Sequence, residues 1–370
     1  MIMANISRRT FIKSSAVAMI SYSLPGCTSV LASNEYDEKY ADSPNYHNGK
    51  FKNLIETSEG RKPGTFFEMV GEIIFGAQER EPTFELPVNQ LDTSLFKSSP
   101  DNGLRVTWMG HSSVLVEIDG RCILIDPVWS DRIGPLIGRK RFHKPPIQID
   151  SLPKLDAVLI SHEHYDHLDK DTILSMANRD TKYFVPLGIG EHLKDWGIPA
   201  ERIIEMDWWD SIILGGHDFT IIATPARHYS GRLFSSNPAL WTSWTILGPR
   251  HRVFFSGDTG VLPTFDDIGK KYGPFDLTMI EIGAYHENLG DIHLGPVQAV
   301  DVHLSLRGKM LLPIHWGTFN LGIHAWTDPV ERMIKTATNK SVDFVVPMPG
   351  QPVCTDKPID LKKWWIKSLS

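Results

Sequence analysis

The feature that most constrains this chain is a cluster of metal-ligand residue types directly after a predicted buried strand. Residues 157–160 read Ala-Val-Leu-Ile, an apolar and partly β-branched run typical of a strand. Residues 162–167 then read His-Glu-His-Tyr-Asp-His. Imidazole and carboxylate groups suit zinc and similar divalent ions. A solvated polar loop is the alternative, but four ligand-type residues in six positions rarely coincide there. The stretch therefore predicts a metal site at a strand end.

The alternation of these residues indicates more than one ion. In an extended chain, His162 and His164 point the same way. Asp166 and His167 can then turn toward a second ion. Two neighbouring ions need more ligands than this stretch provides, so we expect the others at later strand ends.

Length and composition are those of a globular protein with a sizeable core. The 370 residues suffice for one large or two small domains, with 41% hydrophobic and 22% charged residues. The net charge of −6 lacks the basic excess that nucleic-acid-binding proteins carry, so we expect no nucleic-acid partner.

The N-terminus resembles a twin-arginine export signal. Residues 7–13 read Ser-Arg-Arg-Thr-Phe-Ile-Lys, and a weakly apolar stretch follows. Two cleavage sites stay open: residues 24–27 resemble a lipoprotein box with Cys27 as the lipidated residue, and residues 30–32 suit ordinary signal peptidase. We therefore expect residues 1–32 to be a signal, and the protein to be periplasmic or a membrane-anchored lipoprotein.

Residues 33–100 are expected to form an N-terminal extension, and residues 101–370 the catalytic domain. Apolar residues at helical spacing within 66–75 predict an amphipathic helix in the extension. That helix either packs on the main domain or forms an apolar lid or membrane-touching helix beside a lipid site. The basic loop at 129–150 is either a solvated face or a surface that attracts phosphate head groups or an anionic membrane.

The catalytic domain alternates short apolar runs with helical segments. Asp119-Gly120 between two such runs predicts a hairpin. Helices are expected at 170–177 and 189–196. Strands are expected at 104–109, 113–118, 121–126, 182–185, 202–205, 218–223, 240–247, 251–256, 277–282, 310–314 and 342–346. This pattern favours an α+β fold of two packed sheets with helices outside.

Three later residues end apolar runs in the same way. His228 follows residues 223–227, Asp258 stands in Gly-Asp-Thr-Gly at 257–260, and His315 follows the run at 311–314. Each alone is more typical of a structural polar residue, but together they complete a set of five histidines and two aspartates. His111, at a turn between strands, is expected to be at most a supporting residue behind these ligands.

The order His-x-His-x-Asp-His, then a lone His, then Gly-Asp-Thr-Gly, then Ile-His-Trp-Gly-Thr resembles the metallo-β-lactamase superfamily. Within it the chain is most similar to the N-acylphosphatidylethanolamine-hydrolysing phospholipase D group, over about residues 100–350. Supporting stretches include Trp-Met-Gly-His-Ser-Ser at 108–113 and Leu-Trp-Thr-Ser-Trp at 240–244. The resemblance implies a four-layer αββα sandwich with a two-metal site along one edge of the sheets.

The resemblance also implies a ligand assignment. One zinc would be held by His162, His164 and His228, and the other by Asp166, His167 and His315, with Asp258 bridging. Iron or manganese are alternatives to zinc for this ligand type. Two such ions can share a hydroxide that attacks phosphorus while the metals neutralise the developing charge. A homodimer is expected by resemblance only.

The substrate and the catalytic residues stay hypotheses. The leading one is an exported phosphodiesterase acting on N-acylphosphatidylethanolamine-like phospholipids, with Asp166 and His293 as catalytic candidates. His293 can orient substrate or pass a proton, or be structural near a helix start. Arg232 can bind phosphate or pair with a surface acid. A lactone or ester hydrolase, and a non-catalytic envelope protein with a retained metal site, are the alternatives.

Overall fold

The structure, a computed structural model, describes residues 38–57, 71–72, 76–134, 138–215, 218–232, 236–286, 290–357 and 360–367. The predicted signal at 1–32 and the predicted helix at 66–75, apart from residues 71 and 72, lie outside the described residues. Within the described ranges, no helix is both long enough and apolar enough to cross a bilayer.

The first of two large sheets has seven strands in the order β10-β9-β8-β5-β4-β3-β17. Strands β3, β4 and β5 pair antiparallel, and β5, β8, β9 and β10 run parallel. The predicted hairpin joins β4 and β5, and both Asp119 and Gly120 have the positive φ that its tight turn requires. The strands are β3 (Leu104–Gly110), β4 (Ser113–Ile118), β5 (Arg121–Ile125), β8 (Ala157–Leu159), β9 (Lys182–Pro186), β10 (Ile203–Met206) and β17 (Pro352–Cys354).

The second sheet has six strands in the order β11-β12-β13-β14-β15-β16. Neighbours from β11 to β14 are antiparallel, and β14, β15 and β16 are parallel. Its strands are β11 (Ser211–Ile213), β12 (Thr220–Thr224), β13 (Ser243–Leu247), β14 (Arg252–Phe255), β15 (Leu277–Glu281) and β16 (Leu311–Ile314). Two small hairpins pair β1 (Tyr46–His47) with β2 (Lys50–Phe51) and β6 (Arg132–Ile133) with β7 (Arg139–Lys140).

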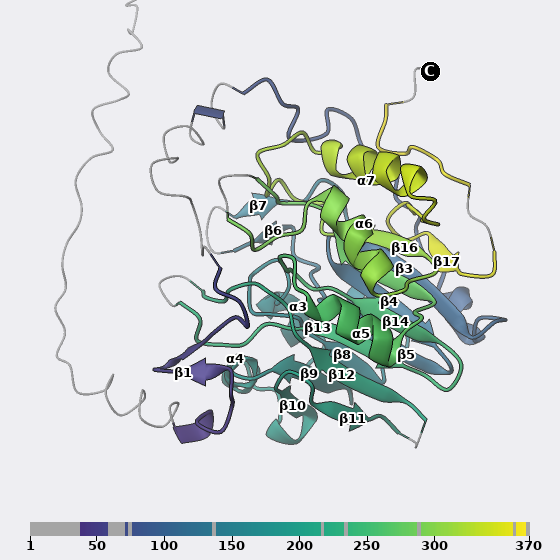
Figure 1. Cartoon of the computed structure of the whole chain (residues 1–370). Helices are drawn as coiled ribbons and strands as arrows, with labels where there is room; N and C mark the ends of the chain where they lie inside the picture. Colours follow the sequence, from purple (N-terminus) through teal and green to yellow (C-terminus); the bar gives the residue numbers. More distant parts are fainter. Residues whose placement is uncertain are drawn as a thin grey trace, which may run out of the picture.

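Helices cover the outer faces of both sheets. The described α-helices are α3 (Lys170–Ser175), α4 (Ile189–Asp195), α5 (Thr264–Tyr272), α6 (Pro296–Ser305) and α7 (Asp328–Asn339). Short 3-10 helices lie at Thr93–Lys97, Ile149–Ser151 and Ala200–Arg202. Helix α4 contacts β9 and β10 of the first sheet, whereas α6 contacts β15 of the second sheet and both α5 and α7. In Figure 1, α5 and α6 lie on the near side of the strands and α3 lies behind them.

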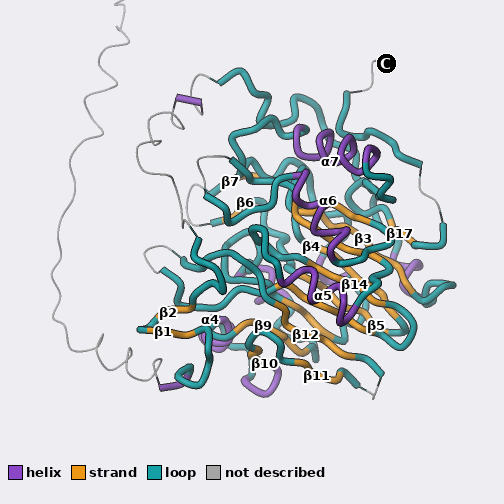
Figure 2. Tube along the Cα trace, in the orientation of Figure 1, coloured by secondary structure: helices purple, strands orange, loops and turns teal. Residues whose placement is uncertain are grey.

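Alternation along the strands builds the layers. On β4, Val114 and Val116 belong to the same buried cluster as Ile246 of the second sheet. Leu115, between them, belongs to a second cluster with Leu193 of α4. Because successive strand residues face opposite sides, the first sheet has apolar contacts on both faces. The strands therefore form the two inner layers, with helices outside (Figure 2), and this confirms the predicted α+β sandwich.

One predicted strand is wrong. Residues 342–346 form no ladder, although Val342, Val345 and Val346 are buried. Their one bridge joins Phe344 to Leu311 at the edge of β16. Pro347 and Pro349 follow directly and lack the N–H groups that a longer pairing needs, so the apolar run is buried as an irregular segment.

Strand direction determines where the site lies. Strand β12 is antiparallel to β13, which is antiparallel to β14, so β12 and β14 run the same way. Strands β15 and β16 share that direction, as β3, β5 and β8 share theirs. The segments that follow β3, β5, β8, β12, β14 and β16 carry His111, Asp126, His162–His167, His228, Asp258 and His315, respectively.

Candidate metal centre

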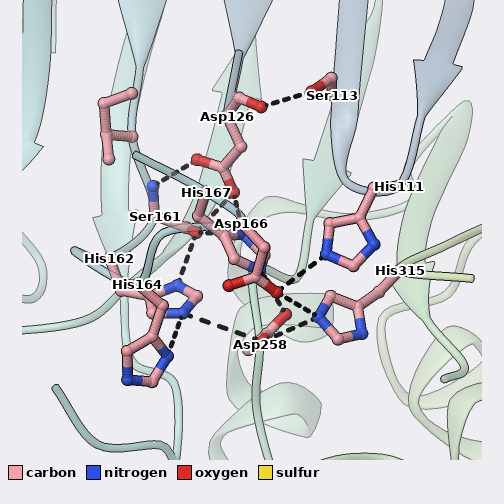
Figure 3. A network of polar contacts seen from close by, with 12 residues as sticks. His111, Ser113, Asp126, Ser161, His162, His164, Asp166, His167, Asp258 and His315 are labelled. Atoms are coloured by element: carbon pink, nitrogen blue, oxygen red, sulfur yellow. Dashed lines mark hydrogen bonds and ion pairs between the residues drawn. The ribbon is translucent and has the colours of Figure 1, made fainter. Parts of the chain in front are cut away.

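The predicted ligands converge at the carboxyl ends of these strands. Figure 3 shows the side chains of His162 and His164, from the segment after β8, pointing toward those of Asp258 and His315. Both sheets contribute, since the segment after β8 belongs to the first sheet and Asp258 and His315 follow strands of the second. The structure therefore brings together residues that lie up to 153 positions apart in the chain.

Three imidazoles form the first group of donors. His164 Nδ1 lies 2.9 Å from His162 Nε2 and 3.2 Å from His228 Nε2. All three side chains offer ligand atoms close enough to hold one ion. Burial lowers the pKa of His162 and His228 well below the ordinary value of histidine, and lowers that of His164 to about 4. These rings are therefore neutral near pH 7, as metal binding requires.

The second group combines Asp166, His167 and His315, as predicted, and adds His111. Asp166 Oδ2 lies 3.6 Å from His167 Nε2 and 3.5 Å from His315 Nε2. His111 Nε2 lies 3.0 Å from the same oxygen. The sequence predicts His111 to be at most a supporting residue behind the ligands, and in the structure its ring contacts the candidate ligand Asp166.

Asp258 lies between the two groups. Its Oδ1 is 3.2 Å from His167 Nε2, and its Oδ2 is 3.1 Å from His315 Nε2. The same Oδ2 is 3.8 Å from His162 Nε2 and 3.9 Å from His228 Nε2. A carboxylate in this position can give one oxygen to each of two ions.

Charge inside the second group is balanced by protons. Burial alone would raise the pKa of Asp166 and Asp258, but the neighbouring histidines, His167 first, lower both well below the ordinary value. Burial alone would lower the pKa of His315, but Asp258 and Asp166 outweigh it and raise the value to about 10. The pKa of His167 is likewise raised well above its ordinary value. Protons on these rings thus supply the positive charge that a cation would supply.

The residues present fit divalent ions. The facing nitrogens, Nε2 of His167 and Nε2 of His315, are buried and lack a well-aligned hydrogen bond within the described part of the chain. Asp258 Oδ1 is likewise buried and lacks a well-aligned hydrogen bond within the described residues. Unpartnered buried polar atoms are costly, so their convergence on one point is typical of a site built for a ligand. Imidazole and carboxylate donors suit zinc, iron or manganese.

Supporting contacts fix the ligand rings. His167 Nδ1 lies 2.7 Å from Asp126 Oδ2, and His228 Nδ1 lies 2.9 Å from the carbonyl oxygen of Ile292. Asp126 in turn accepts the backbone N–H of Ser161 at 2.7 Å and its hydroxyl at 2.6 Å. Such contacts orient a histidine and leave its other nitrogen free for metal.

Several residues at this edge have strained backbones. His111, Asp126 and His315 have φ values of 53°, 43° and 61°. Left-handed conformations are uncommon for residues with side chains and cluster at functional sites. Here they turn the chain sharply at the strand ends, which aims the side chains into the centre.

His293 reaches the centre from the loop before α6. Its Nδ1 lies 2.7 Å from Glu281 Oε2 at the end of β15, and 3.8 Å from Asp258 Oδ2. The sequence reasoning missed Glu281, although an acidic residue ending the apolar run at 277–281 repeats the pattern that identified Asp258. Burial lowers the pKa of His293, but Glu281 outweighs that effect and raises it overall.

A cavity of about 820 Å³ opens above the ligands. Asp166, Asp258, His293 and His315 lie along its polar part, and Arg139 contributes a cationic group. The remaining lining is largely apolar or aromatic and comprises Ile133, Gly134, Gly138, Tyr165, Tyr229, Ala284, Ile292 and Leu321, together with His164. A site of this size and character can hold a largely apolar molecule with one polar group at the metal ligands.

Arg232, the predicted phosphate ligand, is not among the residues that line this cavity. Its Nε donates to the carbonyl oxygen of Glu163 at 2.6 Å, and its Nη2 donates to that of Leu168. The guanidinium also packs on the rings of Tyr165 and Trp196. In these contacts it joins the two ends of the segment that carries His164, Asp166 and His167.

Comparison with known proteins agrees with this geometry. Residues 121–316 match the family model of the beta-lactamase superfamily domain. An uncharacterized protein of Mycobacterium tuberculosis is 42% identical over 337 residues, which cover 87% of each chain. The N-acyl-phosphatidylethanolamine-hydrolyzing phospholipase D 1 of Caenorhabditis elegans is 40% identical over 250 residues, covering 64% of this chain and 70% of the relative.

A solved structure shares the fold. Igni18, a metallo hydrolase from the archaeon Ignicoccus hospitalis, superposes with a TM-score of 0.54 at 27% identity, covering 68% of this chain and 97% of Igni18. The family model covers more than half of the chain, and the donor groups described above lie at the expected edge of the sandwich. The chain therefore belongs to the beta-lactamase superfamily and is a metal-dependent hydrolase of that superfamily.

Proposed function

We propose that this protein is a binuclear phosphodiesterase of phospholipase D type that hydrolyses N-acylphosphatidylethanolamine-like phospholipids. The observation that carries the proposal is the pair of donor groups joined by Asp258 at the base of a large, mostly apolar cavity. The 40% identity to a relative named for that reaction supports the substrate class. Zinc is the proposed metal, with iron and manganese as alternatives.

The proposed ligands are those of the two donor groups. His162, His164 and His228 would hold one ion, and Asp166, His167 and His315 the other, with Asp258 shared. Two ions held there would supply Lewis-acid chemistry, polarising a phosphoryl oxygen, activating water near neutral pH and stabilising negative charge on the reacting oxygens.

His293 and the cavity wall have separate roles. Because Glu281 accepts from His293 Nδ1, the ring is held with its Nε2 available, in a side chain that lines the cavity. A histidine held in this way can donate a proton to the leaving alkoxide. The apolar wall, including Ile133 and Leu321, would exclude water and accept acyl chains, while Arg139 can bind the phosphate oxygens.

Product analysis tests the function. Metal-loaded protein is incubated with N-acylphosphatidylethanolamine in heavy-oxygen water, in parallel with a panel of lactones and carboxylic esters. We expect equal amounts of N-acylethanolamine and phosphatidic acid, with the heavy oxygen in the phosphatidic acid because water attacks phosphorus. Lactone or ester opening without phospholipid cleavage would overturn the proposal in favour of another bond type. A protein that binds both metals and cleaves nothing would indicate a binding role.

Export by the twin-arginine route is part of the same proposal. The paired Arg8-Arg9 near the N-terminus supports it, and residues 1–32 would be the signal. Fractionation of cells producing the protein, with Arg8 and Arg9 changed to lysine as the matched control, tests it. A periplasmic or membrane-bound protein that becomes cytoplasmic in the control is the expected result.

A further inference from the structure

The N-terminal arm, defined here as residues 38–57, contacts β10 of the first sheet and the segments that follow β12 and precede β13 of the second. Tyr40, Tyr46 and Phe51 form a buried cluster with Trp208 and Trp241 of the catalytic domain. Phe51 is fully buried and its N–H donates to the carbonyl oxygen of Asn237 at 3.0 Å. The arm is therefore bound along its length rather than only at one end.

Asn53, in this arm, forms two hydrogen bonds with the backbone of His228, a proposed metal ligand. The N–H of His228 donates to Asn53 Oδ1 at 3.0 Å, and Asn53 Nδ2 donates to the carbonyl oxygen of His228 at 2.7 Å. Asn53 Oδ1 also accepts from Trp241 Nε1 at 3.1 Å. The side-chain amide thus pairs with both backbone groups of His228, as a neighbouring strand would.

The next residues of the arm join a second loop of the centre. The carbonyl oxygen of Glu56 accepts from Arg227 Nη2 at 2.7 Å, and Thr57 Oγ1 contacts Asp291. Arg227 also pairs with Asp291, and Ile292 accepts from the ring of His228. The arm therefore connects the loop that carries His228 with the loop that leads to His293.

We propose that Asn53 is a positioning residue for the metal ligand His228, so that the arm completes the metal centre although it belongs to the N-terminal extension. His228 has no regular strand partner at this position, because β12 ends at Thr224. The two bonds from Asn53 fix its peptide, and the bond to Ile292 fixes its ring. The inference rests on the metal centre of the proposed function and adds a residue outside the matched family model.

The test compares Asn53→Ala with Asn45→Ala. Asn45 anchors the same arm at another point, where its Nδ2 donates to Asp207 Oδ1 at 2.7 Å, and it forms no hydrogen bond with the described residues of the metal centre. Two readouts are measured: hydrogen exchange of the peptide around residues 226–231 in metal-stripped protein, and zinc affinity by chelator competition. The variant His228→Ala identifies which of the two bound zinc ions depends on His228.

We expect N53A to accelerate hydrogen exchange at the His228 amide. We also expect N53A to lower the affinity for the zinc ion that H228A fails to bind by about 10–100-fold, the range typical for loss of a contact that orients a ligand. N45A should change neither. Asn53→Asp, which keeps the acceptor for the His228 N–H but loses the donor to its carbonyl, should lie between wild type and N53A, and it replaces N53A if that variant does not fold.

Equal effects of N45A and N53A would overturn the inference, because the arm would then act only by general docking. Wild-type exchange and zinc affinity in N53A would overturn it as well. These outcomes are separate from failure of the proposed function, since a wild-type protein that binds metal but cleaves no phospholipid can still show the effect of N53A. The exchange readout needs no bound metal.

Discussion

His167 is held by Asp126, whose Oδ2 lies 2.7 Å from His167 Nδ1 with both side chains fully buried. Asp126 also accepts two bonds from Ser161. The carboxylate, which follows β5, thus accepts three bonds from the segment after β8, and Asp126 is not among the residues that line the cavity. Since it requires its partner to donate from Nδ1, it directs the other nitrogen of His167 toward Asp258.

Asp126→Asn should therefore weaken metal binding. One carboxylate oxygen becomes an NH₂ group that faces donors, so at least one of the three bonds is lost and the His167 ring loses its fixed tautomer. We expect zinc affinity to fall by about 10–100-fold in chelator competition. Asp156→Asn, at the opposite end of β8, is the matched control, because Asp156 contacts Arg121 and Cys122 and no metal-ligand residue. An unchanged affinity in D126N would refute the role of Asp126.

His164→Ala and Asp258→Ala should each abolish hydrolysis while the protein stays soluble. Each change removes a donor to the proposed metals, and D258A removes the group shared by both. We expect the rate to fall by at least about 10³-fold, measured by product formation under saturating substrate. Metal analysis should show loss from both positions in D258A and from one in H164A. Retained turnover in both variants would contradict the two-metal mechanism.

Metal binding should release protons. Without metal, the pKa of His315 is raised to about 10 and that of His167 is raised well above its ordinary value, so both rings are protonated at pH 7–8. Metal must displace these protons, and we expect about two to be released per filled centre. Titration calorimetry in buffers of different ionisation enthalpy measures this number. The apparent metal affinity should increase with pH. A heat of metal binding that does not depend on the buffer would show that the rings are already neutral.

The same shift predicts how the metal-free protein responds to pH. The pKa of His315 is higher in the folded chain than the value of about 6.5 expected in an unfolded chain. Its interaction with Asp258 and Asp166 therefore stabilises the fold fully below about pH 6.5 and is lost as the pH rises through about 10. Urea unfolding of stripped protein from pH 6 to 10 should show this decline, and metal-loaded protein should show less of it.

Arg232→Met separates loop support from substrate binding. The guanidinium joins the carbonyl oxygens of Glu163 and Leu168, so its loss should reduce the free energy of unfolding by about 2–3 kcal/mol and weaken metal binding. If loop support is its main role, KM stays within about twofold of wild type in enzyme saturated with metal. A large increase in KM at unchanged stability would instead support the phosphate contact predicted from the sequence. Arg202→Met, which also removes an arginine bonded to backbone carbonyls but lies far from the ligands in the chain, is the control.

The strands that carry the site could be predicted because local pattern and burial agree there. Residues 114–116 and 157–160 are continuous apolar runs, and the Asp119-Gly120 turn strongly favours a hairpin. Residues 342–346 show the limit of that reasoning. Their apolar character predicted burial correctly but did not predict strand pairing. Only the packed structure shows that this segment pairs with β16 through one isolated bridge.

The candidate ligands could be predicted from the sequence because imidazoles and carboxylates at the ends of apolar runs have few structural explanations. Three of the histidines lie within six consecutive residues, 162–167. The other candidates, His228, Asp258 and His315, each follow a strand. Glu281 followed the same rule and was overlooked, since a single acidic residue at a strand end is common. His111 looked like an ordinary turn residue because its contact with Asp166 spans 55 positions of the chain.

The sequence by itself determined the donor chemistry, the order of the ligands and the strands that carry them, because these depend on residue type and local pattern. The tertiary structure alone decided which residues meet. The packing of the two sheets brings Asp258 between the two histidine groups, and it lets Asp126 and Glu281 orient ligand and cavity histidines. Asn53 illustrates the difference most clearly, because its hydrogen bonds to His228 span 175 positions and nothing in its local sequence marks it. Long-range contacts of this kind follow from how the layers pack, which no single segment encodes.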